Sequence, residues 1–559
     1  MQPFDEFLGG GQTSRTIRVF CSSETYLELV RQLENSPELT RRWQENVHSA
    51  FIYSAEDETS LQKLANLLGS GRVLVSGDAG NGSKAQMHFL VSDDAELCGV
   101  MAGVRVKASS SPTALLSGPF GRGIRSIISL NEQSAFVLAR HRDIALFLST
   151  SSQIVDLDAE LARGIFDIRE HALTAIPIAL YVKWAFALSC WQPAEVTACL
   201  IIDDPLLKRS HGFVDFSELL SLMKRHHFSA NIAFIPWNWR RSNPDVVRLF
   251  LDNSESYSIS VHGCDHTRAE FGSENVQQSS ARIRRAVARM AEHERRSGIH
   301  HDRVMVFPQG VFSAAAMAAL KQSELIAAVN NDTISADEPP LPITISDVWN
   351  VAVMKYGDFP LFTRRYPWEG IENFAFDALL GKPVLLVIHH DSCRDHCRRL
   401  IDFIDRLNAS KVAPVWRNLT EVVRRSYRQR RPSEGAVEVE MFATELLLEN
   451  CSGEEEDFTV NREESAPSSI QEIHVGSQSV DWNATEQGVS FGTRLKAGES
   501  ALVKVIFKKP EIGREEWNGA RSEARIMLRR YLCEVRDNYV TKGKVLFTAA
   551  LGKKDDEWV

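Results

Sequence analysis

The stretch TACLIIDD, residues 197–204, places a continuous apolar run directly before two aspartates. The same arrangement recurs in YSISVHGCDH (257–266), VMVFPQG (304–310) and VLLVIHHD (384–391). Strands of a parallel sheet are buried on both faces, so they appear in a sequence as nearly continuous apolar runs. In barrels of parallel strands, functional groups collect at the carboxyl ends of the strands. Carboxylates and imidazoles repeated at one such edge indicate a metal-assisted hydrolase.

These segments belong to a central region, residues 176–432, in which strand and helix patterns alternate. Strands are expected at 197–203, 231–236, 257–262, 303–307, 325–330, 348–354 and 384–390. Apolar residues at one-face helical spacing lie between several of them. Repeated strand–helix units predict an α/β fold with a parallel sheet, either closed as a barrel or open.

Two further domains are expected, because 559 residues are more than one ordinary core can hold. Residues 1–175 alternate short apolar runs with polar, helix-like stretches, which predicts an α/β domain. Residues 433–559 contain alternating apolar and polar positions separated by turn-rich segments, which predicts a small antiparallel β-sandwich. A terminal helix is expected at 520–535, with its arginines on an ordinary exposed face.

The composition, with 44% hydrophobic and 25% charged residues, is typical of a soluble globular protein. The formal net charge of -9 argues against general binding of nucleic acid, since phosphate recognition depends largely on Lys and Arg. The glycine-rich segment 77–84 superficially resembles a phosphate-binding loop. Its lysine follows the serine instead of preceding it, so a plain turn is favoured.

The N-terminus has no basic segment followed by an apolar core, so no secretory signal is expected. We find no uninterrupted apolar stretch long enough to span a bilayer. The nine cysteines are scattered and odd in number, which fits reduced thiols better than a disulfide framework. These features predict a cytoplasmic protein without a membrane span.

His262 and His266 form an H-x3-H pair that begins at a strand end. Two imidazoles at this spacing can turn toward one divalent ion if the loop between them curls. A carboxylate from another strand, Asp204 or Asp203, would complete three protein ligands and leave open positions for water and substrate. Such an open site suits catalysis, because the metal lowers the pKa of its bound water.

Other polar and aromatic groups follow strand ends. Adjacent residues of a strand point to opposite sides, so one aspartate can bind metal while the other accepts a proton; the pair alone also fits a polar turn. His389 or His390 could protonate a leaving amine, although a lone histidine there is more often a core or capping residue. Trp237 either stacks on a sugar ring or fills the core.

The order Asp-Asp, H-x3-H, Pro-x-Gly and late His, over about residues 195–430, resembles the NodB-homology polysaccharide deacetylases, carbohydrate esterase family 4. The resemblance implies a distorted (β/α) barrel that holds a divalent metal, usually zinc. By position, Asp203 matches the family's catalytic base and Asp204 its metal carboxylate. His262 and His266 match the two metal imidazoles.

The later motifs supply the remaining groups that the resemblance implies. Pro308-Gln309-Gly310 matches the groove motif whose backbone amide helps to stabilise the oxyanion. His390, directly before Asp391, best matches the late catalytic histidine, and His389 is close enough to exchange places with it.

Several positions depart from the family pattern. Pro205 stands where the family has glycine, and Gly263 stands where it has serine or threonine. Val306 replaces the arginine that orients the base, so the role of Asp203 is implied less firmly than the metal set. Asp347 and Trp349 are candidates for an Asp and a Trp of the family.

The implied function is metal-dependent hydrolysis of a carbon–nitrogen amide bond, with N-deacetylation of a sugar or glycoconjugate precursor as the leading case. The expected partners are a carbohydrate or small amide substrate and a divalent metal of the zinc type. Two alternatives stay open. One is a non-catalytic relative that binds carbohydrate or a partner; the other is a metal hydrolase of another amide or an ester.

Overall fold

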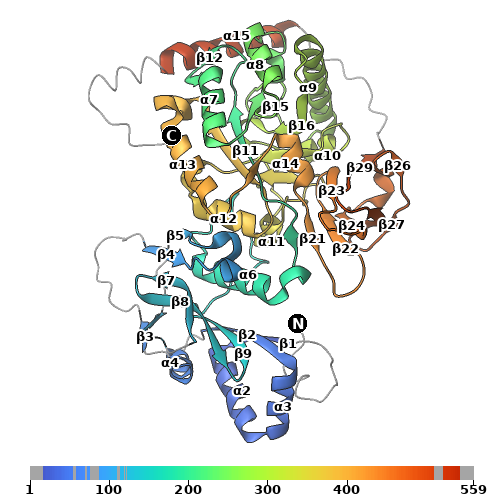
Figure 1. The fold of residues 1–559 in the computed structure, drawn as a ribbon. Helices are drawn as coiled ribbons and strands as arrows, with labels where there is room; N and C mark the ends of the chain where they lie inside the picture. Colours follow the sequence, from blue (N-terminus) through green and yellow to red (C-terminus); the bar gives the residue numbers. More distant parts are fainter. Residues whose placement is uncertain are drawn as a thin grey trace, which may run out of the picture. The chain divides into compact units, whose positions relative to one another are not determined.

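The computed structural model describes residues 17–54, 58–69, 72–75, 87–109, 114–118, 120, 123–508 and 520–541. The chain forms two compact units, Met1–Asp156 with Asp167–Cys190 and Leu157–Phe166 with Trp191–Val559 (Figure 1). The first residues of the N-terminus and the glycine-rich segment 77–84 lie outside the described residues. The domain boundaries at 175 and 432 stay predictions.

The first unit is a mixed α/β structure built on one nine-stranded sheet, with a main path in the order β1-β2-β9-β8-β7-β4-β5. Its strands are β1 (Ile17–Ser22), β2 (Val47–Tyr53), β3 (Arg72–Val75), β4 (Met87–Val91), β5 (Arg105–Ala108), β6 (Ala114–Ser117), β7 (Arg125–Leu130), β8 (Gln133–His141) and β9 (Ile144–Ser149). Helices α2 (Ser23–Asn35), α3 (Pro37–Asn46) and α4 (Glu58–Leu67) contribute Tyr26, Trp43 and Leu61 to its core.

One apolar helix qualifies the expectation about membranes. The segment Ala172–Ser189, made of α6 (Ala172–Phe186) and the short turn η2 (Ala187–Ser189), has a mean hydropathy of 1.5. Among the described residues it is the one helix long and apolar enough to cross a membrane by length and composition. Core helices of globular domains meet the same criterion, so this is weak evidence, and the absence of a span stays a prediction.

The second unit contains a parallel sheet in the order β18-β17-β16-β15-β14-β11-β19, with β20 paired to β11. The strands are β11 (Thr197–Asp203), β14 (Ala230–Phe234), β15 (Tyr257–His262), β16 (His301–Val306), β17 (Ala327–Asn330), β18 (Leu361–Thr363), β19 (Val384–His389) and β20 (Val415–Trp416). A parallel bridge between Arg365 and Leu386 links the two end strands, so the sheet is nearly closed into a barrel. Its strands are almost wholly buried, as the continuous apolar runs predicted.

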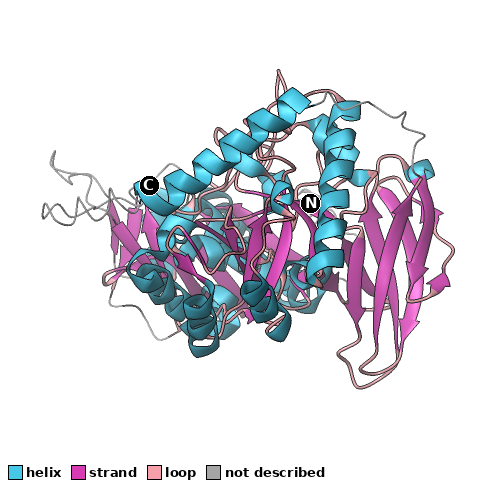
Figure 2. Ribbon diagram, turned by 90° about the horizontal axis from the view of Figure 1, so that it is seen from above, coloured by secondary structure: helices cyan, strands magenta, loops and turns pink. Residues whose placement is uncertain are grey.

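Helices connect the strands and lie outside them (Figures 1 and 2). They are α7 (Phe216–His226), α8 (Pro244–Asp252), α9 (Val276–Ser297), α10 (Ala314–Lys321), α12 (Ile371–Leu379), α13 (Arg398–Ala409) and α14 (Leu419–Arg425). Each connection returns the chain to the same end of the barrel, because parallel strands need a crossover. The carboxyl ends of the strands therefore meet at one edge.

The strand predicted at 348–354 is wrong. The chain forms helix α11 (Ile345–Trp349) there, and the strand that completes the barrel is β18, further along the chain. Thr344 and Asp347 make reciprocal side chain–backbone hydrogen bonds, a capping box that starts the helix. Asp347 therefore caps a helix, and Trp349 packs its ring against Phe166 and Phe376.

The chain after the barrel, joined by the short strand β10 that precedes it, forms two stacked sheets, in the orders β10-β21-β22-β24-β28-β27 and β23-β29-β25-β26. The strands are β10 (Gln192–Pro193), β21 (Arg428–Arg430), β22 (Val437–Met441), β23 (Glu445–Glu449), β24 (Glu456–Glu463), β25 (Ile470–Val475), β26 (Gln478–Ser479), β27 (Asn483–Ala484), β28 (Gly488–Leu495) and β29 (Ser500–Phe507). All pairs are antiparallel except β22 with β24, which is parallel and departs from the predicted pattern. Figure 2 shows this sandwich as a block made almost wholly of strands.

The terminal helix α15 (Ala520–Val535) and the π-helical turn η8 (Arg536–Val540) lie over the carboxyl ends of the barrel strands (Figure 1). Glu534 forms ion pairs with Lys208 and Arg241, which follow β11 and β14. Gly212 N–H donates to Asn538 Oδ1 at 2.8 Å. These contacts involve the segments that follow the barrel strands. The helix therefore covers the end of the barrel where the strands terminate, which we call the barrel mouth.

The exposed face predicted for the arginines of this helix is wrong for Arg530, whereas Arg525 and Arg536 are exposed as expected. Arg530 is buried, whereas Leu528 and Leu532 are exposed at 61% and 59%. The reason is the surface beneath: the loops at this end of the barrel carry charged and polar groups, which attract the polar face of the helix. The apolar stripe therefore faces away from the barrel.

Candidate metal centre and its neighbours

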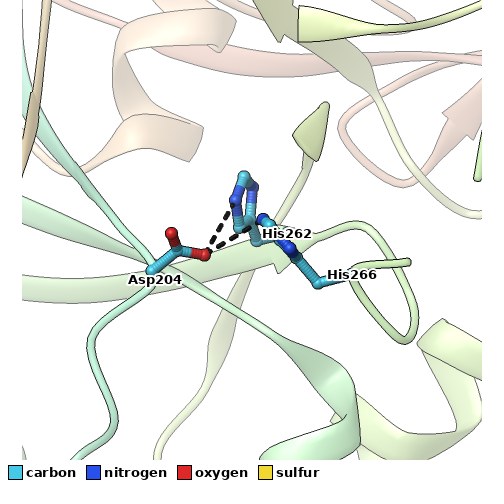
Figure 3. A group of neighbouring side chains, drawn as sticks. All are labelled: Asp204, His262 and His266. Carbon is cyan, nitrogen blue, oxygen red and sulfur yellow. Dashed lines mark ion pairs between the residues drawn. The ribbon is translucent and has the colours of Figure 1, made fainter. Parts of the chain in front are cut away.

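Asp204, His262 and His266 come together at the carboxyl ends of β11 and β15 (Figure 3). Asp204 Oδ1 lies 3.6 Å from His262 Nε2 and 3.1 Å from His266 Nε2. Ligand atoms about 2.0–2.2 Å from one zinc ion are separated by comparable distances. Within the described residues Asp204 Oδ1 is buried without a hydrogen-bond partner, which fits a carboxylate placed to bind a cation.

The electrostatics of these three residues favour the forms that bind metal. Burial alone would raise the pKa of Asp204, but His266 and His262 hold the pKa of that carboxyl well below its ordinary value. His262 Nδ1 lies 2.9 Å from the carbonyl oxygen of Val306 and donates to it. This bond leaves Nε2 as the free nitrogen, turned toward Asp204, as a metal ligand requires.

The loop that carries His266 is organised by a carboxylate that the sequence analysis did not identify. Glu270 accepts hydrogen bonds from the backbone N–H groups of Cys264 at 2.8 Å, Asp265 at 3.1 Å, His266 at 3.3 Å and Thr267 at 3.3 Å. Successive N–H groups turned to one anion form a concave anion-binding loop. Glu270 thus fixes the curl that turns the second imidazole back toward the first.

Gly263 explains one departure from the family pattern. Its φ is +64°, a region that side chains rarely adopt. A Cβ here would lie 2.1 Å from Glu270 Oε1 and 2.8 Å from Pro308 Cγ. Serine or threonine therefore does not fit beside His262 while Glu270 holds the loop.

Backbone strain gathers at the same edge. Asp204, His266 and Gln309 have φ values of 80°, 55° and 59°, which non-glycine residues seldom adopt. Each such residue costs roughly 1–3 kcal/mol and persists only where its surroundings enforce it. The Asp-Asp, H-x3-H and Pro-x-Gly motifs thus each contain one strained residue. At this edge the fold keeps the side chains in place despite the cost in backbone free energy.

Asp203 pairs with an arginine from another strand. Its two oxygens lie 2.6 and 2.7 Å from Nη1 and Nη2 of Arg364, and both side chains are buried. Burial alone would raise the pKa of Asp203, but Arg364 and then His262 lower it. Arg364 follows β18, so Asp203 has an arginine partner although the motif carries Val306 in place of an arginine. Sequence reasoning missed it because β18 itself was not predicted.

The adjacent histidines at the end of β19 have different surroundings. His389 lies opposite Asp203 in the β11–β19 ladder and is among the groups that lower its pKa. The ring of His389 stacks near Tyr366, with centroids 6.3 Å apart. His390 instead lies beside His211, with ring centroids 5.6 Å apart.

The groove motif Pro308-Gln309-Gly310 forms the short turn η4 (Pro308–Gly310) directly after β16. Gln309 Oε1 accepts a hydrogen bond from Ala269 N–H at 3.2 Å. Gly310 O accepts one from Asn330 Nδ2 at 2.8 Å. The motif is therefore tied to the loop that carries His266 and lies at the same edge as the three candidate ligands.

Trp237, the candidate for sugar stacking, follows β14 and is half-buried against the terminal helix. Its ring meets Tyr531 of α15 edge to face, with centroids 6.3 Å apart. The Arg241 guanidinium lies 5.5 Å from the centre of the same ring. The Trp237 ring therefore packs against the terminal helix.

No protein-family model and no curated protein matches this chain. Solved structures are similar to it. A family 4 carbohydrate esterase from Streptomyces lividans in complex with acetate is 15% identical, with 39% of this chain and 91% of that chain covered and a TM-score of 0.24. A family 4 carbohydrate esterase from Bacillus anthracis is 14% identical, with 44% and 92% covered and a TM-score of 0.26.

A pseudoenzyme of the same family from Bacillus anthracis is 11% identical, with 39% of this chain and 62% of that chain covered and a TM-score of 0.24. Two of these solved structures are family 4 carbohydrate esterases, the family that the motifs resemble. At these identities and TM-scores we base the function on the residues of the site.

Proposed function

We propose that the second unit is a metal-dependent hydrolase of carbon–nitrogen amide bonds, acting by N-deacetylation of a sugar or glycoconjugate precursor. One observation carries the proposal: Asp204, His262 and His266 direct their ligand atoms toward one another beside the buried pair of Asp203 and Arg364. Asp204, His262 and His266 would hold a divalent ion of the zinc type, which would act as a Lewis acid toward a carbonyl and lower the pKa of bound water.

Asp203 is the proton acceptor in this proposal. Its lowered pKa keeps it ionised at neutral pH, and the two-point contact with Arg364 fixes the plane of the carboxylate. Each carboxylate oxygen still has a second lone pair with which to accept a proton. Arg364 thus positions the base.

His389 is the proton donor to the departing amine in this proposal. It stands opposite Asp203 across the β11–β19 ladder, so an acid and a base flank the same point. The backbone amide of Gln309, in the strained turn at the same edge, supports the negative charge that develops on the carbonyl oxygen.

We place the reaction in the cytoplasm, with a soluble glycoside, nucleotide sugar or lipid-linked precursor as substrate. All nine cysteines are free thiols in the structure, which supports a reducing compartment. Extracellular polymers such as chitin would be out of reach there.

A second candidate function is binding without catalysis. The observation that favours it is the helix α15 over the strand ends, with Tyr531 against the candidate stacking residue Trp237. A helix that covers the carboxyl ends of the strands is compatible with a protein that binds a partner without catalysis, and also with an enzyme whose site is regulated by that helix.

The test is acetate release from N-acetylated amino sugars, measured together with metal content by elemental analysis. We expect zinc in the wild type. Asp204→Asn should lose acetate release together with the zinc ion that Asp204, His262 and His266 hold. The matched control is Asp245→Asn, an exposed carboxylate on α8, which should change neither. Zinc without acetate release points to another amide or ester, and no zinc at Asp204 points to the binding function.

A further inference from the structure

A second group of possible ligands lies outside the candidate metal centre. His211, His390 and Asp537 come from three segments, namely β12 (Ser210–His211), η6 (His390–Cys397) and η8. Their ligand atoms all lie within 4.8 Å of one another. None of the three belongs to the set of Asp204, His262 and His266.

The separations exclude direct hydrogen bonds between the histidines and the carboxylate. Asp537 Oδ1 lies 3.6 Å from His390 Nε2, and Oδ2 lies 3.8 Å from His211 Nε2. Both distances exceed those of ordinary hydrogen bonds. Atoms held about 2.0–2.2 Å from one ion stand roughly 3.3–4 Å apart, so these distances suit two ligands of the same cation.

The histidines also have ring nitrogens that need a partner. His211 is only 3% exposed, and among the described residues neither of its ring nitrogens has a hydrogen-bond partner. His390 Nδ1 is buried and unpartnered in the same way. Buried polar atoms without partners are rare, because a polar atom that leaves water without gaining a new hydrogen bond costs free energy. A bound cation would supply the missing partner of His211.

The protonation states of the group suit a metal. Burial, followed by the neighbouring His390, lowers the pKa of His211 to about 4, so its imidazole is neutral at neutral pH. Burial opposes ionisation of Asp537, but His390 and Arg536 lower the pKa of that carboxyl. Arg536 Nε donates to Asp537 Oδ1 at 2.6 Å, an outer contact that orients the carboxylate and leaves Oδ2 toward His211.

Gly212 provides the close approach that the group requires. Its φ is +56°, and a Cβ there would lie 2.3 Å from His390 Nδ1. The same residue donates its N–H to Asn538, next to Asp537. The backbone beside His211 thus makes room for one histidine and binds the segment that carries the carboxylate.

We propose that His211, His390 and Asp537 bind a second divalent cation of the zinc type, which clamps the terminal helix α15–η8 onto the carboxyl ends of the barrel strands. The cation joins a barrel loop, the segment after β19 and the helix at one point. His390 is then a ligand rather than the proton donor, in agreement with the role proposed for His389.

The test counts zinc per chain after reconstitution and removal of free metal. We expect two ions in the wild type, one in His211→Ala, one in Asp537→Asn, one in Asp204→Asn and none in the double variant His211→Ala/Asp204→Asn. The control is His226→Ala, because His226 also faces an aspartate, Asp405, but at a hydrogen-bond distance of 2.8 Å. This control should retain both ions.

A count that is the same in wild type, His211→Ala and Asp537→Asn would overturn the proposal and leave a water-bridged polar cluster. The zinc count also distinguishes a failure of this proposal from a failure of the proposed hydrolase function. An ion lost in His211→Ala but not in Asp204→Asn supports the clamp and contradicts the hydrolase. If His211→Ala fails to fold, Asp537→Asn still decides the matter.

Hydrogen exchange of residues 520–541 gives a second measurement. Zinc should slow exchange there in the wild type and in Asp204→Asn, but not in Asp537→Asn. Equal exchange with and without zinc in the wild type would contradict a clamp. This readout does not depend on catalytic activity.

Discussion

Asp203 and Arg364 are two opposite charges buried together, with 5% and 2% of their side chains exposed. Their attraction offsets the cost of removing both from water only while both are present. The pair lies 161 positions apart in sequence. Its geometry therefore depends on correct closure of the barrel between β18 and β19, the strand that pairs with β11.

We predict that Arg364→Met lowers the free energy of unfolding by about 3–5 kcal/mol, because it leaves the Asp203 carboxylate buried and unpaired. The double variant Asp203→Asn/Arg364→Met should recover part of this loss, since no unpaired charge remains. Urea denaturation of the four proteins of the cycle measures the effect. Arg209→Met, at an exposed ion pair, is the control, and an equal loss in that variant would contradict the prediction.

Among the site residues, those that belong to one short sequence motif were predicted from the sequence. His262 and His266 are four residues apart and Asp204 follows a clear strand, so their meeting could be anticipated. The contact of Arg364 with Asp203 could not be anticipated, because the two residues are distant in sequence. Glu270 was missed because its partners are backbone N–H groups, which carry no residue signature.

Among the helices, α9 shows how an internal histidine couples packing to pH. His293 is 1% exposed, its ring lies 4.9 Å from that of Phe234 in β14, and its Nε2 is 2.8 Å from Ser242 Oγ. Burial, followed by the positive charges of His301 and Arg296, lowers the pKa of His293 to about 4. The folded protein therefore holds this imidazole neutral.

We predict that His293 makes the protein less stable as pH falls from about 6.5 to about 4. The unfolded chain binds a proton at about pH 6.5, whereas the folded chain does so only near pH 4. Protonation thus favours the unfolded state, by about 3 kcal/mol over this window. Urea denaturation across the window should show a weaker pH dependence in His293→Gln; His300→Gln, at an exposed position, should match the wild type.

Elements with long apolar runs were predicted well, and short ones were not. Strand β11 occupies the expected range 197–203, whereas β18 has only three residues, too few to show a pattern. The apolar run at 348–354 overlaps helix α11, whose capping box outweighs it. The helix α15 was predicted, but the orientation of its apolar stripe depends on the polar surface beneath, which no single element reveals.

Across the molecule, a buried arginine joins the sandwich to the barrel. Arg462 on β24 is fully buried and donates to Asp358 O at 2.7 Å and Glu464 Oε2 at 3.2 Å. Lys321 at the end of α10 binds the other oxygen of Glu464 at 2.7 Å. The junction therefore holds several charges that are balanced only when both parts are folded together.

We predict that barrel and sandwich unfold in one transition in the wild type and in separate transitions in Arg462→Met. The substitution leaves Glu464 short of a partner and should cost about 3–5 kcal/mol. Denaturation followed by tryptophan fluorescence and by hydrogen exchange of the sandwich measures it. Arg494→Met, in an exposed pair with Asp457, should keep the single transition, and a single transition in both variants would contradict the coupling.

The helix over the strand ends also fixes an order of events during synthesis. The ribosome adds roughly 5–20 residues per second, and domains fold from the N-terminal side first. His390 is made well before residues 520–541, so the barrel mouth stays uncovered for on the order of ten seconds. Metal ions can reach the strand ends in that interval without displacing any protein segment. If the proposed metal sites bind as argued above, we therefore expect metal to bind the nascent chain more readily than the finished protein.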